Sequence, residues 1–484
     1  MLLNDLLKAA DVLESAGDCS ANVSSLEFDS RRVTPGALFF ATRGTQADGH
    51  AFIEAAVGAG AVAVVCETMP ERLAEGVAYL RVADSSVALG RMASAFYGDP
   101  SRSLRLVGVT GTNGKTTTAT LLYRLFRSLG YKAGLISTVT YCIDSERRES
   151  THTTPDSVRL NRMMAEMVGR GCEYCFMEVS SHSLVQHRTE GLHFAGAVFT
   201  NITHDHLDYH HTFAEYIRAK KMLFDALEKE AFALTNADDR NGRVMVQNTA
   251  AVVSTYSLRS MADFRCKIVE MHLDGMLLRL DGQELWVGLL GRFNAYNLLA
   301  VYGAAVLLGL DRGEVLRVLS MLHAVSGRFE KVRAANGTTA IVDYAHTPDA
   351  LENVIQTIEE IRTPEQQLIV VCGCGGDRDK TKRPEMAAIA VKYATTAVFT
   401  SDNPRHESPE AILDDMAAGI EPGARYLRIA DRAEAIRTAV MLSRPGDIIL
   451  VAGKGHETYQ VVGDVKHHFD DREEVRKAFD TLIK

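Results

Sequence analysis

Short runs of β-branched and aliphatic residues alternate with segments of helical periodicity along most of the chain. In the middle and last parts, the apolar run 104–109 precedes a helical stretch at 116–130, and the run 368–374 precedes another at 384–394. Strands that alternate with helices in this way predict mostly parallel sheets covered by helices. The N-terminal part also mixes expected strands, at 37–41 and 61–66, with helices, in an order that the pattern leaves open.

Turn-forming residues divide the chain at two points. The sequence YGDPS at 97–101 stands before the run 104–109. A second boundary, at Ser326-Gly327-Arg328, follows a helical stretch at 297–308 and precedes a β-rich start at 340–342. A chain of 484 residues is too long for one domain with a single hydrophobic core, because single domains usually run ~100–200 residues. We therefore predict an α/β protein with three domains, at 1–99, 100–326 and 327–484.

Charge and hydropathy argue against several classes of protein. The net charge is −9 and no basic stripe is visible, which argues against nucleic-acid binding. The N-terminal residues 1–18 are amphipathic and acidic, unlike a secretory signal. Glycines interrupt the longest apolar stretch, at 55–66, and it is short of the ~18 residues that a membrane span needs. We expect a cytoplasmic protein that does not enter a membrane.

Cysteines do not indicate a disulfide framework or a metal site. The spacing Cys172-Glu-Tyr-Cys175 occurs in zinc and redox motifs, but it lies in an apolar segment with no second pair nearby. Cys372 and Cys374 lie in a glycine-rich turn. We interpret all four as buried thiols.

The stretch GVTGTNGKTT at 108–117 follows an apolar strand and opens a helical segment. Glycines let backbone N–H groups face an anion, and the helix N-terminus adds partial positive charge. Lys115 can reach the outer phosphates of a nucleotide, and Thr116 can offer a hydroxyl to Mg²⁺. The strict phosphate-loop pattern needs glycine at 109, where this chain has Val109. The context still favours a nucleotide-phosphate site over a structural glycine turn.

Acidic and histidine side chains gather after two further expected strands. Glu178 follows the run 174–177, and the stretch VFTNITHDHLDYH at 198–210 begins with the next strand. An acid at the carboxyl end of a parallel strand faces the crevice where such sheets bind ligands. Oxygen and nitrogen donors beside a phosphate loop suit Mg²⁺, which shares its coordination shell with phosphate. A histidine–aspartate cluster alone also fits zinc, and the upstream phosphate loop favours magnesium.

In their order along the chain, these motifs resemble those of the Mur ligase family. The matching stretches are GTNGKTT at 111–117, DHLDYH at 205–210, GRFNAYN at 291–297 and DNPR at 402–405. The resemblance covers essentially the whole chain. It implies a UDP-binding domain, a central P-loop ATPase domain with a mostly parallel sheet, and a Rossmann-like C-terminal domain.

The resemblance also implies a reaction. The family member indicated by these motifs would join meso-diaminopimelate to UDP-N-acetylmuramoyl-L-alanyl-D-glutamate in peptidoglycan synthesis, using ATP and an acyl phosphate intermediate. A monomer is expected, because one chain supplies every motif. Three alternatives stay open: a lysine-adding sister ligase, a folylpolyglutamate synthetase-like ligase and a non-catalytic nucleotide-dependent switch.

The resemblance assigns the catalytic and metal-binding residues one by one. Thr116, Glu178 and His206 match the metal ligands. Lys220 stands where the family has a lysine that reacts with CO₂ to give a carbamate, an anion able to hold a second Mg²⁺. Without the resemblance, Lys220 reads as a solvated helix lysine beside Lys221, as most lysines do.

The remaining assignments concern the three substrates. Implied contacts to ATP are Gly111, Thr112, Asn113, Gly114, Lys115, Thr116, Thr117, Asn294 and, from a closing third domain, Arg328, Asp343 and His346. Implied contacts to the UDP-substrate are Phe28, Ser30, Thr45, Gln46, Ala47, His152, Thr153, Thr154, Ser180, Gln186 and Arg188. The family often has another polar residue where this chain has His152.

The amino-acid site carries the specificity prediction. Diaminopimelate differs from lysine by a second carboxylate, which a guanidinium can bind bidentately. The DNPR form resembles diaminopimelate-adding enzymes, and lysine-adding relatives differ at the arginine position. Asn403 and Arg405 are therefore expected to hold the distal carboxylate. The full implied pocket is Arg378, Asp402, Asn403, Pro404, Arg405, Gly453 and Glu457.

Overall fold

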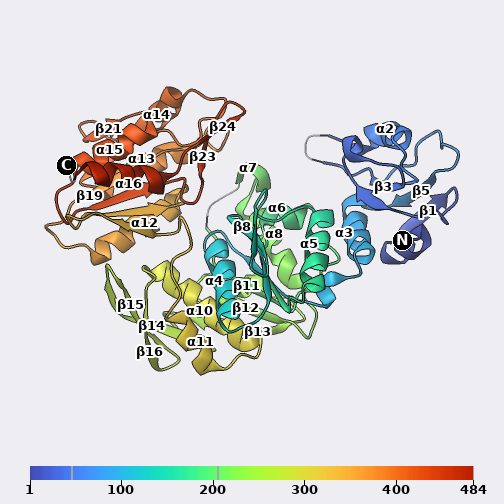
Figure 1. Cartoon of the computed structure of the whole chain (residues 1–484), viewed down its shortest axis with the longest axis horizontal. Coiled ribbons are helices and arrows are strands. Elements are labelled where there is room, and N and C mark those ends of the chain that lie inside the picture. The colour runs from blue at the N-terminus through green and yellow to red at the C-terminus, as the bar shows by residue number, and fades with distance from the viewer. Residues whose placement is uncertain (45–46, 204–206, 483–484) are drawn as a thin grey trace. The chain divides into compact units, whose positions relative to one another are not determined.

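A computed structural model of the chain describes residues 1–44, 47–203 and 207–482 (Figure 1). It forms two compact units. The first comprises residues 1–111, 122–200 and 214–255, and the second comprises 112–121, 201–213 and 256–484. The predicted site residues Thr45, Gln46 and His206 lie outside the described residues. None of the helices in the described parts is long and apolar enough to cross a membrane.

A five-stranded sheet lies near the N-terminus of the first unit, with strand order β1-β5-β4-β3-β2. Its central strands are fully buried, and apolar clusters cover both faces. Strand β1 is antiparallel to β5, and the other strands run parallel. The elements are α1 (Leu3–Leu6), β1 (Val12–Ala16), β2 (Ser25–Glu27), β3 (Ala37–Phe40), α2 (Ile53–Gly58), β4 (Ala63–Cys66), β5 (Ala78–Val82) and α3 (Ser85–Phe96).

The first unit also holds a larger sheet, whose centre has the order β12-β11-β6-β10-β7 and is parallel throughout. These strands are buried along nearly their whole length, which explains why they read as continuous apolar runs. Antiparallel strands β8 and β9 extend one edge. The strands are β6 (Arg105–Thr110), β7 (Ala133–Ile136), β8 (Thr140–Ile143), β9 (Glu146–Glu149), β10 (Tyr174–Glu178), β11 (Gly196–Phe199), β12 (Phe232–Asn236) and β13 (Val252–Ser257).

Helices follow these strands, as the alternation predicts. They are α4 (Lys115–Ser128), α5 (Ser157–Gly169), α6 (Ser181–Val185), α7 (Leu207–His210), α8 (Phe213–Asp225) and α9 (Gly242–Met245). An antiparallel meander and two helices continue the chain: β14 (Phe264–His272), β15 (Gly275–Leu280), β16 (Gln283–Val287), α10 (Arg292–Leu307) and α11 (Arg312–Leu319). Helix α10 begins at Arg292, earlier than the predicted stretch 297–308, because Gly291 with φ 94° supplies its non-helical start.

The C-terminal part of the second unit is a six-stranded sheet with order β17-β18-β22-β19-β20-β21. Only β17 is antiparallel to its neighbour. Helices α15 and α16 pack on one face and contact each other, and α13 contacts β19 and β20 between α12 and α14 (Figure 1). The elements are β17 (Glu330–Arg333), β18 (Thr339–Asp343), α12 (Pro348–Ile361), β19 (Leu368–Cys372), α13 (Lys382–Tyr393), β20 (Thr396–Phe399), α14 (Pro409–Ala417), β21 (Tyr426–Arg428), α15 (Arg432–Leu442), β22 (Ile448–Ala452), β23 (Tyr459–Val462), β24 (Val465–His468) and α16 (Asp471–Thr481).

The predicted fold class is confirmed: the chain is α/β, and parallel strands form the centre of both the eleven-stranded and the six-stranded sheet. The strand predictions agree with the structure to within two residues at 37–41, 61–66, 104–109 and 174–177. The four cysteines that we interpreted as buried thiols are buried and free of disulfides. The domain boundaries near residues 99 and 326 stay predictions.

Candidate active site

The predicted phosphate loop lies between strand β6 and helix α4. Gly111 has φ 150° and Gly114 has φ 87°, so both glycines adopt backbone conformations that other residues rarely reach. A Cβ atom on Gly114 would lie 2.4 Å from Asn297 Oδ1, which leaves no room for a side chain. Lys115 Nζ donates to the carbonyl of Thr112 at 2.9 Å, so the lysine folds back over the loop that a phosphate would enter.

The loop is held from behind by Asn201, which follows strand β11. The Thr112 N–H donates to the Asn201 carbonyl at 2.8 Å. The Asn113 N–H donates to Asn201 Oδ1 at 3.0 Å, and Asn201 Nδ2 returns a bond to the Asn113 carbonyl at 3.0 Å. These bonds fix the loop's backbone before any nucleotide arrives, which is the preorganisation that electrostatic catalysis requires.

Lys220 lies on α8 and is buried, with 1% of its surface exposed. Its Nζ donates to the carbonyl of Gly111 at 2.7 Å and lies 4.5 Å from the ring centroid of Tyr216. The interpretation of Lys220 as a solvated helix lysine is therefore wrong. Its neighbour Lys221 instead forms an ion pair with Asp225 on the same helix. The structure thus places Lys220, and not Lys221, at the start of the phosphate loop.

Glu178 ends β10 with its side chain buried. Its Oε1 accepts from the Thr138 N–H at 2.7 Å and its Oε2 from the Thr138 hydroxyl at 3.3 Å. The Thr138 hydroxyl is also 2.9 Å from Thr153 Oγ1, and Thr154 Oγ1 donates to the Glu178 carbonyl at 2.8 Å. Predicted metal and substrate residues therefore share one hydrogen-bonded cluster.

The same cluster extends to the loop after β10. Arg188 Nη1 donates to the Thr154 carbonyl at 2.8 Å, and Arg188 Nη2 donates to Gln186 Oε1 at 2.6 Å. The Ser180 hydroxyl caps α6 by accepting from Ser183 N–H. Partial desolvation of the His152 ring, together with nearby Arg188, lowers its pKa. The structure brings these predicted contacts together, although they come from separate loops.

Near the N-terminus, the structure describes three of the five predicted uridine contacts. Phe28 packs against the apolar core, Ser30 begins a 3₁₀ turn that Asp29 caps, and Ala47 is exposed. Their role stays a prediction.

The residues predicted to contact ATP from the third domain surround the turn at Gly327. Both carboxylate oxygens of buried Asp343 accept backbone N–H groups, from Phe329 at 2.6 Å and Ala345 at 2.8 Å. Desolvation raises the pKa of Asp343. The Arg328 guanidinium lies 4.6 Å from the ring centroid of Tyr344, whose carbonyl is 2.8 Å from His346 Nδ1. Asp343 thus fixes the turn that presents Arg328.

Asn294, in the first turn of α10, is buried, and its side chain bonds one residue before the helix and one within it. Its Nδ2 donates to the Leu290 carbonyl at 2.7 Å, and its Oδ1 accepts from Asn297 Nδ2 at 3.2 Å. Asn297 Oδ1 in turn lies 3.5 Å from Thr118 Oγ1 on α4. Asn294 therefore supports the phosphate loop through Asn297, and a direct contact to ATP stays a prediction.

The predicted amino-acid pocket is built from loops after β19, β20 and β22, at the carboxyl end of the parallel sheet, where such sheets bind ligands. Asn403 Nδ2 donates to Glu457 Oε2 at 2.8 Å, and Lys454 Nζ donates to both Asn403 Oδ1 and Glu457 Oε2 at 3.1 Å. Burial, reinforced by the charge of Asp402, raises the pKa of Glu457. The pocket therefore contains a desolvated carboxylate next to a buried lysine.

Lys454 and Arg383 were not predicted as site residues, because lysine and arginine usually lie at the surface. Both side chains are fully buried. A lysine between two glycines directly after a buried strand, as in GKG at 453–455, is the signal that could have identified Lys454. The sequence offers no comparable signal for Arg383, which lies in the first turn of α13.

Three family models match the chain in succession. They are described as Mur ligase family, catalytic domain (residues 22–97), Mur ligase middle domain (109–305) and Mur ligase, glutamate ligase domain (327–455). Each covers one of the regions whose motifs the sequence analysis singled out.

Curated relatives match over nearly the whole length. The chain is 55% identical to the UDP-N-acetylmuramoyl-L-alanyl-D-glutamate–2,6-diaminopimelate ligase of Bacteroides thetaiotaomicron, over 99% of this chain and 100% of that protein. It is 56% identical to the ligase of the same name from Parabacteroides distasonis, over 99% of both. A solved structure of a ligase with this name is 34% identical with a TM-score of 0.70, and covers 100% of this chain and 99% of that one.

Proposed function

Because the chain belongs to the Mur ligase family, we propose that it joins meso-diaminopimelate to UDP-N-acetylmuramoyl-L-alanyl-D-glutamate, with ATP as co-substrate. Curated ligases of that name, 53–56% identical over essentially the full length, support the substrate assignment. The chain is an ATP-dependent, amide-bond-forming ligase of peptidoglycan synthesis.

The chemistry has two steps. The D-glutamate side-chain carboxylate attacks the γ-phosphorus of ATP, giving an acyl phosphate and releasing ADP. An amine of diaminopimelate then attacks the acyl carbon, phosphate leaves, and the amine gives up a proton as the amide forms. Lys115 stabilises charge on the transferring phosphoryl group, and the bonds between Asn201 and the phosphate loop hold that loop in place.

One observation carries the choice of amino acid. Arg378 follows β19, Arg405 follows β20 and Glu457 follows β22, so all three come from loops at the carboxyl end of one parallel sheet, and this arrangement supports a site that offers both guanidinium and carboxylate groups. A carboxylate suits an ammonium group, and guanidinium groups suit carboxylates. A diaminopimelate molecule carries both kinds of group at both ends, whereas lysine lacks the distal carboxylate. The lysine-adding alternative is therefore not favoured.

We propose Mg²⁺ as the metal, because the predicted ligands offer hard oxygen donors. Two of them are the Thr116 hydroxyl and the Glu178 carboxylate, which suit Mg²⁺ alongside nucleotide oxygens. The other predicted ligands are His206, which lies outside the described residues, and a carbamate on Lys220, and nucleotide oxygens would complete the shell. Bound Mg²⁺ would neutralise charge on the phosphates.

Three further assignments are proposals. Three domains, at 1–99, 100–326 and 327–484, are supported by the order of the family matches. A cytoplasmic location is supported by the use of ATP and by the free thiols of the described cysteines. A monomer is supported by the presence of every motif on one chain.

ADP release tests the proposed function. Wild-type protein with ATP, Mg²⁺ and UDP-N-acetylmuramoyl-L-alanyl-D-glutamate should release ADP in an amount matching product only when meso-diaminopimelate is added. L-lysine, glutamate and the dipeptide D-alanyl-D-alanine serve as comparison amine substrates. If ADP release is fastest with one of these compounds, the protein is the ligase that adds that compound, and the proposed substrate is wrong.

Lys220→Ala is expected to be nearly inactive, because buried Lys220 lies at the start of the phosphate loop, where a carbamate would supply an anion. Added acetate or another short carboxylate should restore part of the activity by filling the vacated anionic position. Lys221→Ala, which removes the adjacent ion pair with Asp225, is the matched control and should keep near-normal activity. Intact mass at ample bicarbonate and neutral pH should show the carbamate; an unmodified lysine under those conditions contradicts the assignment.

A further inference from the structure

Two loops carry the arginines of the amino-acid pocket, and each contains a non-glycine residue with a disfavoured backbone. Loop 373–381 follows β19 and presents Arg378, and loop 400–408 follows β20 and presents Arg405. Asp377 has φ 53° and Arg405 has φ 51°, in the left-handed region. Such conformations persist only where surrounding contacts hold them, and they cluster at functional sites. The contacts that hold these loops therefore control where the guanidinium groups lie.

The two loops are bonded directly to each other. The Gly376 N–H donates to the Asn403 carbonyl at 2.9 Å, and Arg405 Nη1 donates to the Gly376 carbonyl at 2.8 Å. A Cβ atom on Gly376 would lie 1.9 Å from the Pro404 carbonyl oxygen, so the backbones touch. A shift of either loop would therefore move Arg405.

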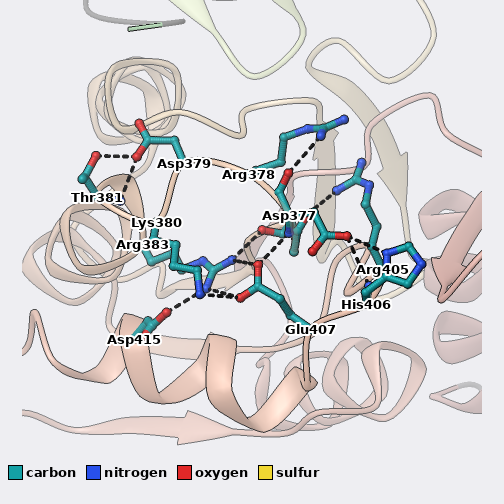
Figure 2. Close-up of polar contacts among 12 residues, drawn as sticks. Asp377, Arg378, Asp379, Lys380, Thr381, Arg383, Arg405, His406, Glu407 and Asp415 are labelled. Atoms are coloured by element: carbon teal, nitrogen blue, oxygen red, sulfur yellow. Dashed lines mark hydrogen bonds and ion pairs between the residues drawn. The ribbon is translucent and has the colours of Figure 1, made fainter. Parts of the chain in front are cut away.

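A buried arginine fastens this pair of loops from below (Figure 2). Arg383 donates to both carboxylate oxygens of Glu407, at 3.0 and 2.9 Å, and to the Gly375 carbonyl at 3.1 Å. Glu407 belongs to the second loop, yet its Oε1 accepts from the Asp377 N–H at 2.6 Å in the first. Lys380 in the first loop also pairs with Glu407, at 3.0 Å. Glu407 thus joins Arg383 to both loops.

Arg383 has a second carboxylate partner, Asp415, which does not bond the two loops to each other. Its Nη1 donates to Asp415 Oδ2 at 2.7 Å, and Asp415 lies on α14. In Figure 2 the guanidinium groups of Arg378 and Arg405 lie on the other side of the loops from Arg383. Arg405 Nη1 donates to the Gly376 carbonyl, whereas its Nε and Nη2 make no hydrogen bond to protein in the described residues.

We propose that Arg383 and Glu407 are positioning residues that set the specificity for the amino-acid substrate. They hold the two loops in place, including the left-handed backbones of Asp377 and Arg405, so that Arg405 and Arg378 meet the distal carboxylate with their free donors already aligned. A buried guanidinium keeps its place only while its partners stay, which makes the Arg383–Glu407 pair a rigid anchor. The inference rests on the proposed ligase function.

Glu407→Gln and Asp415→Asn form a matched pair for the test. Each removes one negative charge from a partner of Arg383 with almost no change in shape, and of these two carboxylates Glu407 is the one that joins the two loops. Saturation curves for diaminopimelate and for L-lysine are measured on both variants and on wild type, at saturating ATP and UDP-dipeptide. Thermal melting is recorded for each protein to separate stability from positioning.

Glu407→Gln should raise KM for diaminopimelate at least about tenfold, with kcat and the KM values for ATP and UDP-dipeptide within about twofold of wild type. The preference for diaminopimelate over lysine should fall by a similar factor. Asp415→Asn should change each quantity less than about twofold. In an Arg405→Ala background, Glu407→Gln should add little, because the two changes act through the same guanidinium.

Equal effects of the two variants on KM, or a loss in Glu407→Gln confined to melting temperature or kcat, would overturn the positioning role. If Glu407→Gln fails to fold, Lys380→Met tests the same link from the exposed side of Glu407 and should move KM in the same direction. Failure of wild type to release ADP with diaminopimelate would instead overturn the proposed function.

Discussion

Lys115→Ala is expected to lose at least about a thousandfold in kcat/KM, roughly the effect of removing a main stabiliser of charge on the transferring group. Lys115 lies at the phosphate loop with its Nζ bonded to the Thr112 carbonyl, and we expect it to contact the ATP phosphates and not the UDP-dipeptide. Binding of UDP-dipeptide should therefore stay near normal. The measurements are steady-state ADP release and calorimetric titration with UDP-dipeptide.

The matched control for this change is Lys132→Ala. Lys132 is exposed and its Nζ donates to the Arg170 carbonyl, away from the loop. That variant should keep wild-type activity. Retention of more than about a tenth of kcat/KM in Lys115→Ala, a loss of only ~1.4 kcal/mol in transition-state stabilisation, would contradict the role of Lys115.

Wild-type enzyme is expected to prefer meso-diaminopimelate over L-lysine by at least ~100-fold in kcat/KM. Lysine leaves the guanidinium of Arg405 without the distal carboxylate, and an unpaired desolvated charge costs on the order of 3–5 kcal/mol. About 2.7 kcal/mol of that cost gives the ~100-fold ratio. Arg405 is half-buried and already bonded to Gly376 by one nitrogen, so we expect the lower part of this range.

Arg405→Ala should lose most activity with diaminopimelate and much of the discrimination, without becoming a good lysine ligase, since Lys454, Asn403 and Glu457 keep their bonded arrangement. Arg428→Ala is the control, because Arg428 pairs with Asp414 and Glu410 on α14 and touches neither pocket loop. The measurement is a pair of saturation curves, for diaminopimelate and for L-lysine, on wild type and on each variant. An unchanged ratio in Arg405→Ala would show that Arg405 does not read the distal carboxylate.

Local pattern was enough to predict the strands and the phosphate loop. The runs at 104–109, 174–177 and 368–374 become buried parallel strands, because a strand covered on both faces must be apolar throughout. The glycines of GTNGKTT have the positive φ that only glycine adopts easily. These signals are local, since the physical requirement acts on neighbouring residues.

The functional assignments needed more than local pattern. Position after a strand pointed to Glu178, whereas the family resemblance pointed to Lys220 and Arg405, and periodicity alone gave Lys220 as an ordinary surface lysine. The fold class and the ligase function were confirmed by the structure and by the relatives. The site residues stay predictions that the experiments above can test.

Tertiary structure alone decided which charged side chains are buried and what they hold. Lys220 is sealed against the Gly111 carbonyl, 109 positions away in the chain, and Lys454 meets Asn403 across 51 positions. Arg383 is buried because α13, α14 and two loops pack around it. No sequence pattern near residue 383 predicts that burial. Burial of a charge depends on partners brought in by distant segments, so the sequence determined the sheets and the phosphate loop, and the packing of the sheets determined the anchors of the site.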